Sequence, residues 1–392
     1  MNFKTRLSVL ILSTPVLAFV LVGGFMGKAS AGSDDQGLRH LRVFEDVVSL
    51  VMSNYVEEVK IDRAMEGALR GLADGLDPDS AYLNASQVKL VEAGDKVPEG
   101  EVGIELTRQY YLRVIAARDG SPAAKAGLQT GDYVRAIDGK PTREMSVFEG
   151  TRLLRGQPGS KVTLTIIRGN AAEPHEIALV REKSAGAAVT SRMLGTDTGY
   201  VRIPAFSNGV ADQLKTALAS LTKSGAKSLV IDIRRTAEGP YENAVQAARL
   251  FVKAGTIAMK GGRDPKTPAE KITAAAGDGA FELPVSLLVT AGTSGAAEVF
   301  AAALDSTGRA EIVGEQTLGR AGVQKLVKLP ENRGLWLTYA RYLTPKGEAL
   351  HGKGLEPDLA VNDPDVEFGA PAPQTDPILD AAIERLKTKK AA

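Results

Sequence analysis

The chain contains no cysteine among its 392 residues, and it has only three histidines, His40, His175 and His351. The missing thiols exclude disulfide bonds, cysteine nucleophiles, cysteine metal ligands and a lipid anchor on an N-terminal cysteine. The histidines are scattered along the sequence and form no metal-ligand pattern. We therefore predict a protein that has no metal site and needs no cofactor.

The chain also lacks an excess of charge of either sign, since its 48 basic and 47 acidic residues give a formal net charge of +1. Charges mixed in this way predict no extended surface for nucleic acid. Hydrophobic residues make up 44% of the sequence and charged residues 24%. This composition suffices for one large core or two to three smaller ones, with disorder expected only near the ends.

A long uncharged stretch runs from residue 7 to residue 27, after Lys4 and Arg6 and before Ala29-Ser30-Ala31. A basic start, an apolar middle and small residues are typical of a secretory signal. The stretch is also just long enough to span a bilayer, which takes about 20 residues. Residues 1–31 are therefore expected to be a signal peptide, which the small residues favour, or a membrane anchor. Either way we predict export to the periplasm or another extracytoplasmic space, with the chain released or held in the inner membrane by residues 7–27.

Residues 32–96 are expected to form an N-terminal helical region. Apolar residues recur at helical spacing from residue 38 to residue 76, with a break at 54–56 and a helix start at Ile61 and Asp62. This pattern predicts two amphipathic helices that serve packing rather than chemistry.

Residues 97–183 are predicted to form a separate small domain rich in β-strands. Strands are expected at 103–106, 111–116, 131–137 and 162–168, with a capped helical turn after Ser121 and a helix over 147–154. The last of these strands is expected to close the sheet, and Asp138-Gly139 marks a tight turn. This order of elements, with its glycine and proline positions, resembles a PDZ domain.

The resemblance to a PDZ domain implies a role in peptide binding. In that fold the last residues of a partner add as an extra strand, while N–H groups of a glycine loop hold the terminal carboxylate. Here the loop corresponds to Val102, Gly103 and Ile104, followed by Leu106, and the glycine allows close backbone approach. The partners predicted in this way are protein or peptide C-termini. The alternative is that Gly103 serves only a β-turn.

Residues 184–365 are predicted to form an α/β core, after a linker at 184–190 that is rich in Ala, Gly and Ser. Strands expected at 199–203, 228–234 and 285–290 alternate with helices expected at 210–223, 243–252 and 296–305. Repeated strand-helix units predict a sheet whose faces are covered. Residues 366–392 are expected to be a C-terminal tail with a short helix.

Two segments of this core carry a more specific resemblance. Residues 287–298 read Leu-Leu-Val-Thr-Ala-Gly-Thr-Ser-Gly-Ala-Ala-Glu, and residues 314–324 read Gly-Glu-Gln-Thr-Leu-Gly-Arg-Ala-Gly-Val-Gln. Both resemble the active-site region of the carboxyl-terminal processing proteases, which are S41-type serine proteases with a PDZ domain. The resemblance extends from residue 38 to about residue 361. It implies a multidomain fold of mixed α+β and α/β class, with a helical lead-in, a PDZ-like β-rich domain and an α/β protease-like core.

The chemical positions of that family are altered in this chain. An ungapped match places the serine nucleophile of the family at Gly295, its lysine base at Arg320, and the residue that orients the base at Gln324. A glycine offers no nucleophile. A guanidinium does not lose its proton near neutral pH and therefore cannot act as a general base.

A third alteration concerns the oxyanion hole. The family carries Asn-Asn-Pro-Gly-Gly after the second core strand, and this chain has Arg-Thr-Ala-Glu-Gly there, so Glu238 takes the place of a glycine whose N–H binds the oxyanion. The loss of one such donor typically costs about a hundred- to a thousandfold in rate. The three changes together predict a catalytically impaired pseudoprotease that binds protein C-termini.

Two alternatives remain open at the level of the sequence. The chain could be an active serine endopeptidase that trims envelope proteins near their C-termini, with Ser294 as nucleophile or with a rearranged site. Ser294 fits equally well as the N-cap of the helix that begins near Ala296, with Glu298 in a capping box. Lys325 is the nearby lysine that could replace the base, but it is expected to point to solvent. A third interpretation is a regulator that pairs with an active paralogue.

Overall fold

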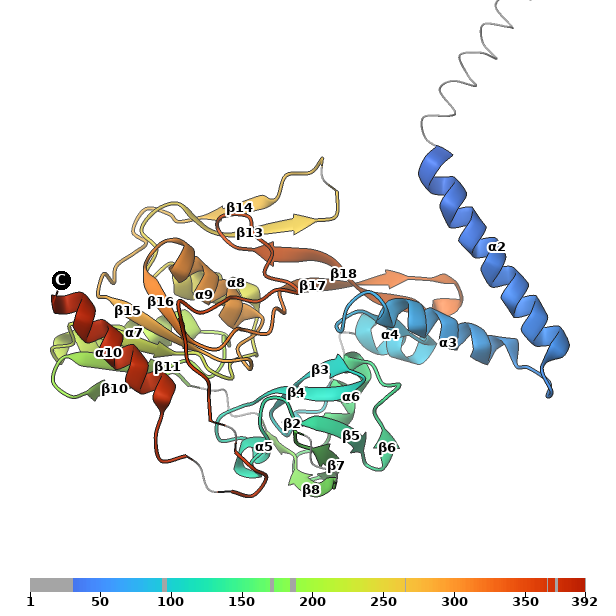
Figure 1. Cartoon of the computed structure of the whole chain (residues 1–392), viewed down its shortest axis with the longest axis horizontal. Helices are drawn as coiled ribbons and strands as arrows, with labels where there is room; N and C mark the ends of the chain where they lie inside the picture. Colours follow the sequence, from blue (N-terminus) through green and yellow to red (C-terminus); the bar gives the residue numbers. More distant parts are fainter. Residues whose placement is uncertain are drawn as a thin grey trace, which may run out of the picture. The chain divides into compact units, whose positions relative to one another are not determined.

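Figure 1 shows the computed structural model of the chain, coloured from blue at the N-terminus to red at the C-terminus. It describes residues 31–93, 97–169, 173–183, 188–264, 266–364, 366–370 and 373–391. Within these ranges no helix is both long and apolar enough to cross a membrane. The expected signal peptide or anchor lies outside the described residues, apart from its last position. The chain divides into two compact units after Leu69.

The first unit contains most of the helical lead-in. Helix α2 spans Ala31–Asn54, and helix α3 spans Ile61–Asp74. The two helices predicted from the apolar spacing are therefore confirmed. Asp62 lies in the first turn of α3, where a negative charge interacts favourably with the helix dipole.

The predicted N-terminal helical region also contains a short strand after its two long helices. A short strand, β1 (Ala81–Leu83), pairs antiparallel with β18 (Gly334–Leu343) from the far end of the chain. Helix α4 (Ala85–Glu92) follows and begins with a capping box made by Asn84 and Gln87. The pairing of β1 holds the preceding residues, 77–80, against the core.

The PDZ-like domain is an antiparallel sheet with the strand order β3-β4-β5-β7-β8, and β6 pairs with β5. The elements are β2 Gly100–Glu101, β3 Ile104–Gln109, β4 Tyr111–Ala117, α5 Pro122–Lys125, β5 Tyr133–Ile137, β6 Lys140–Pro141, α6 Val147–Leu154, β7 Lys161–Ile167, β8 His175–Val180 and β9 Glu182–Lys183. Strand β8 adds outside β7, so the expectation that residues 162–168 close the sheet is wrong. Strand β3 lies at the opposite edge beside α6, which is the edge where a PDZ domain accepts a peptide strand.

A second sheet forms the α/β core that the alternating pattern predicted. Its strand order is β10-β11-β12-β15-β16-β19, and neighbouring strands are parallel except for the antiparallel pair of β10 and β11. The strands are β10 Thr190–Leu194, β11 Thr198–Arg202, β12 Ser228–Asp232, β15 Val285–Val289, β16 Ala310–Gly314 and β19 Leu359–Ala360. Strands β12 and β15 are buried along their whole length, as expected for strands covered on both faces.

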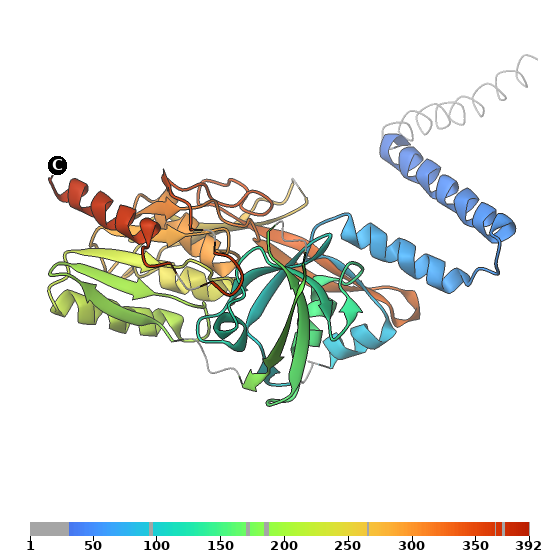
Figure 2. The ribbon, with the colours of Figure 1, turned by 60° about the horizontal axis from the view of Figure 1, so that its bottom comes forward.

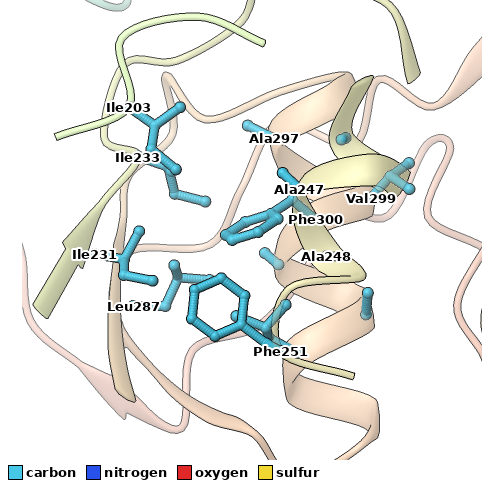
Figure 3. Packing of buried hydrophobic residues seen from close by; sticks show 14 of the residues in the cluster. Ile203, Ile231, Ile233, Ala247, Ala248, Phe251, Leu287, Ala297, Val299 and Phe300 are labelled. Atoms are coloured by element: carbon cyan, nitrogen blue, oxygen red, sulfur yellow. The ribbon is translucent and has the colours of Figure 1, made fainter. Parts of the chain in front are cut away.

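Three helices cover one face of this sheet: α7 (Val210–Lys223), α8 (Tyr241–Ala248) and α9 (Ala296–Ser306). Figure 3 shows how Phe251 and Phe300 fill the space between helices and strands. The two rings meet edge to face with centroids 6.0 Å apart, an arrangement that aromatic pairs prefer. The apolar residues of α9 are buried on every side, so its first turn is held rigidly in the core.

The C-terminal segment is a structural layer rather than a tail, which corrects the sequence prediction. Helix α10 (Pro377–Ala391) covers the other face of the six-stranded sheet (Figures 1 and 2). The buried residues that make this contact are Ile378, Ala382 and Leu386 of the helix and Val230, Leu288 and Val313 of the strands. Just before the helix, Asp376 pairs with Arg234, which also holds Asp232 at the end of β12.

A third sheet has no counterpart in the sequence prediction. Its order is β1-β18-β13-β14, and β17 also pairs with β18. The further strands are β13 Thr256–Gly262, β14 Glu270–Thr273 and β17 Gly322–Lys328, and a short 3-10 turn at Pro330–Asn332 links β17 to β18. Both faces of these strands are partly exposed, so the period-2 hydrophobic signal is weak. Strand β17 begins two residues after Arg320 and carries Gln324.

Candidate active site

The turn between β15 and α9 places Gly295 at the start of a helix and at the wall of a cavity. Gly295 has φ +65° and ψ −123°, a conformation that residues with a side chain rarely adopt. A Cβ added there would lie 3.6 Å from the carbonyl oxygen of Ala237 and 3.8 Å from that of Arg320, so the position has space for a side chain. A strained strand-to-helix turn of this kind exposes the nucleophile of other hydrolases, but here it carries none.

Glu298 connects this turn to the loop that carries Arg320. Its buried carboxylate accepts hydrogen bonds from the backbone N–H groups of Gly295 (3.0 Å), Gly319 (2.6 Å) and Arg320 (2.8 Å), and from the hydroxyl of Thr317. Burial raises the pKa of Glu298 above its ordinary value, while these hydrogen bonds act in the opposite direction. The Glu298 side chain therefore holds both Gly295, the position expected for the nucleophile, and Arg320, the position expected for the base.

Arg320 is surrounded by carboxylates. Its Nε lies 2.9 Å from Oδ1 of Asp79, and its Nη1 lies 3.5 Å from Oε2 of Glu105. Burial acts to lower the pKa of Arg320, but Asp79 and Glu105 outweigh it and raise the pKa above its ordinary value. Burial likewise raises the pKa of Glu105 to about 7, although Arg320 opposes this. Arg320 is therefore a permanent cation, and Asp79 comes from a segment to which the sequence assigned only packing.

Gln324 lines the same cavity but does not contact Arg320 through a hydrogen bond. Its Nε2 donates to the hydroxyl of Thr338 at 3.1 Å, and that hydroxyl donates to Asp77 at 3.2 Å. Lys325 is exposed, and its Nζ lies 4.6 Å from the centre of the Tyr339 ring. The lysine points away from the cavity, as expected.

Ser294 lies in the protein interior rather than in the cavity. Its side chain is fully buried, and its hydroxyl has no hydrogen-bond partner within the described part of the chain. Its N–H donates to the carbonyl oxygen of Thr236 at 3.0 Å. Gly295, not Ser294, is the N-cap of α9, so the predicted capping role of Ser294 is wrong. Glu298 binds the N–H of Gly295 directly and makes a hydroxyl cap unnecessary.

The cavity has a volume of about 210 Å³. Its lining includes Gly295, Arg320, Gln324, Glu238, Glu105 and Tyr241. Four of these residues were singled out in the sequence: Gly295, Arg320, Gln324 and Glu238. Ser294 does not line the cavity. The hydroxyl of Tyr241 donates to the carbonyl oxygens of Arg320 (3.1 Å) and Gly322 (2.9 Å). Burial raises the pKa of this phenol, so it is not an activated nucleophile.

A second cavity adjoins the first and lies between the PDZ-like domain and the α/β core. It is lined by residues 101–105, Arg118 and parts of α6 on one side, and by Pro204, Arg235, Ala237 and Glu238 on the other. Glu105, Ala237 and Glu238 also line the first cavity. The side chains of Val102, Ile104 and Leu106 are buried in the domain core. Within the described part of the chain, the N–H groups of Val102 and Gly103 donate to no protein acceptor. Both residues line the second cavity.

The packing of the loop requires a glycine at position 103. Its φ is +72°, and a Cβ on it would lie 2.3 Å from Cβ of Ser121, the N-cap of α5. The glycine therefore allows the loop to pack on α5, and a side chain at this position would collide with Ser121. A bulky substitution would damage the domain instead of blocking a ligand.

Comparison with known proteins adds an independent finding. A model of peptidase family S41 matches residues 197–361, and a model of the PDZ domain matches residues 113–168. A carboxy-terminal-processing protease of Bartonella bacilliformis is 32% identical over 340 residues, which cover 86% of this chain and 78% of the relative. The carboxy-terminal processing protease CtpA of Bacillus subtilis is 29% identical over 374 residues, which cover 93% of this chain and 79% of the relative. Among solved structures, a photosystem II D1 C-terminal processing protease matches with a TM-score of 0.68 and 27% identity, over 81% of this chain and 86% of the other.

The network around Glu298 predicts a large effect on stability. Glu298→Gln replaces one acceptor oxygen by an NH₂ group that faces other donors, so we expect the free energy of unfolding to fall by about 2–4 kcal/mol. Urea denaturation of the full chain measures this change. The matched control is Glu282→Gln, since Glu282 is 73% exposed and pairs with the exposed Lys253; it should change stability by less than about 0.5 kcal/mol. Equal losses in the two variants would contradict the structural role given to Glu298.

Proposed function

The chain belongs to peptidase family S41, the carboxy-terminal processing proteases, and we propose that it binds protein C-termini through its PDZ domain without hydrolysing them. The observation that carries this proposal is the lining of the cavity at Gly295. The nucleophile position there has no side chain, and the base position holds a guanidinium paired with Asp79. Neither group can start an acyl transfer.

Glu238 adds an electrostatic obstacle to the same chemistry. Its carboxylate stands on the loop 235–239, beside the cavity in which an oxyanion would have to develop. A negative charge at that place destabilises the transition state that oxyanion holes stabilise. Arg118 pairs with Glu238 but does not remove its charge.

The alternative of an active endopeptidase finds less support. Ser294 would have to leave a fully buried position, and a shift of one residue at a helix start turns a side chain by about 100°. The lysine nearest to the base position, Lys325, is exposed on the other side of its strand. A rearranged site would therefore need to rebuild both the nucleophile and the base.

We also propose that the protein acts outside the cytoplasm. The support is the sequence of residues 1–31, with its basic start, its uncharged stretch and its small residues. The protein would then meet the C-termini of exported proteins, either alone or as a regulator beside an active paralogue. Residues 7–27 would decide between release and anchoring in the inner membrane.

The proposal predicts that the chain performs no covalent chemistry. We expect the full chain to show no labelling by a fluorophosphonate probe and no cleavage of unstructured β-casein, because the cavity contains no activated hydroxyl. In-gel fluorescence and electrophoresis measure the two outcomes, and Ser294→Ala serves as the matched control. Labelling of the natural sequence that disappears in this control would overturn the proposal in favour of the active endopeptidase.

The second prediction concerns restoration. Gly295→Ser with Arg320→Lys places a hydroxyl and an amine at the family positions, but Asp79 and Glu105 favour the charged ammonium and raise its pKa. A base works only when neutral, so weak β-casein cleavage should appear and increase as the pH rises toward about 10. Asp79→Asn added to this pair should shift the profile to lower pH, and Glu238→Gly should raise the rate.

The control for restoration is Gly295→Ala with Arg320→Lys, which has the same strained turn and the same lysine but no hydroxyl. It should cleave nothing at any pH. Full activity of the serine and lysine double variant at neutral pH would show that neither the carboxylates nor Glu238 impair the site.

The third prediction concerns binding. A ten-residue peptide that ends in a small apolar residue with a free carboxylate should bind the full chain more tightly than the same peptide with an amidated end. The expected difference is about 1–3 kcal/mol, the range for a hydrogen bond to a charged group. Fluorescence polarisation with labelled peptides measures both affinities. Equal affinities would reduce the PDZ domain to a structural insert.

A further inference from the structure

Arg118 lines the second cavity, which adjoins the cavity at Gly295. It directly follows β4, and its backbone N–H donates to the carbonyl oxygen of Gly103 at 2.9 Å. Its Nη2 lies 3.5 Å from the point that a Cβ of Gly103 would occupy. The guanidinium therefore stands beside the loop formed by residues 102–104, which lines the same cavity.

Two carboxylates already occupy this guanidinium. Its Nη1 lies 2.9 Å from Oε2 of Glu238, and its Nη2 pairs with Glu101. Both terminal nitrogens are thus engaged, and the Arg118 side chain is only 13% exposed. A third anion at the loop has to replace one of the two, because three carboxylates around one cation repel each other.

Glu238 is the partner that can leave. Glu101 is 10% exposed and is also bound by Arg155 at 3.2 Å, whereas Glu238 is 38% exposed. The backbone at Glu238 is held by the N–H of Phe206, which donates to its carbonyl oxygen at 2.8 Å. An exchange therefore requires a rotation of the Glu238 side chain and no movement of the loop.

We infer that Glu238 is an internal competitor of the ligand: it occupies Arg118 in the empty groove and is displaced when the C-terminal carboxylate of a bound peptide takes its place. This inference rests on the proposed binding function and adds the residue that sets its affinity. It assigns Arg118 as the cation that recognises the ligand carboxylate, together with the N–H groups of Val102 and Gly103. It also couples the two cavities, since Glu238 lines both of them and its displacement changes the charge at their shared wall.

The test compares Glu238→Gln with the natural sequence. Glutamine keeps the size of the side chain but removes the charge that competes for Arg118. A set of labelled ten-residue peptides that end in Ala, Val, Leu or Ile, each as free acid and as amide, is titrated against the full chain. We expect Glu238→Gln to raise the affinity for the free acids about fivefold, the size of a partly exposed ion pair, and to leave the amides unchanged.

A control variant separates competition from general electrostatics. Glu182→Gln removes a carboxylate of the same domain that pairs with Lys125 at the domain surface. It should not change the affinity for the free acids more than twofold. In an Arg118→Gln background the effect of Glu238→Gln should vanish, and the preference for free acids should shrink.

The outcomes distinguish this inference from the function on which it rests. If the Glu238→Gln variant binds the free acids and the natural chain does not, competition is supported in its strongest form. If the natural chain prefers the free acids and Glu238→Gln leaves its affinity unchanged, the competition is overturned and the proposed function stands. If the natural chain and the Glu238→Gln variant each bind acids and amides equally, the competition and the proposed function are overturned together. An equal gain for acids and amides, or an equal gain in Glu182→Gln, also overturns the competition.

Discussion

The carboxylate of Glu298 is the interaction on which the geometry of the site depends. Four donors from two loops converge on it, so the turn at Gly295 and the loop at Arg320 cannot move independently. A buried carboxylate is costly unless it is fully hydrogen-bonded, and this one is stabilised by three backbone N–H groups and one hydroxyl rather than by a cation. The turn at Gly295 and the loop at Arg320 are thus held in place by a side chain that belongs to neither position.

Ion pairs dominate the electrostatics around this cavity. Arg320 pairs with Asp79 and Glu105, and Arg118 pairs with Glu101 and Glu238, so each cation is matched by more than one anion. Such a network favours permanently ionised groups, whereas a general base needs a group that is neutral near the working pH. Glu105 and Glu238 line the second cavity as well, so the two cavities share part of their charge.

The sequence predicted local elements well and long-range contacts poorly. The helices at Val147–Leu154 and Val210–Lys223 have the predicted bounds, because their apolar period and their flanking residues agree. The meeting of Gly295, Glu238 and Arg320 followed from resemblance to a family, not from spacing. The contact of Arg320 with Asp79 spans 241 residues, and no local pattern records it. The sheet that contains β17 and β18 was missed because its strands have little alternation.

The position of helix α10 has a consequence for how the chain acquires its fold. The central strands β12 and β15 present apolar residues on the face that α10 covers, and this helix follows every strand of the sheet in the sequence. Until α10 docks, the sheet has one uncovered hydrophobic face. The core is therefore complete only when the segment that follows all of its strands has packed against them.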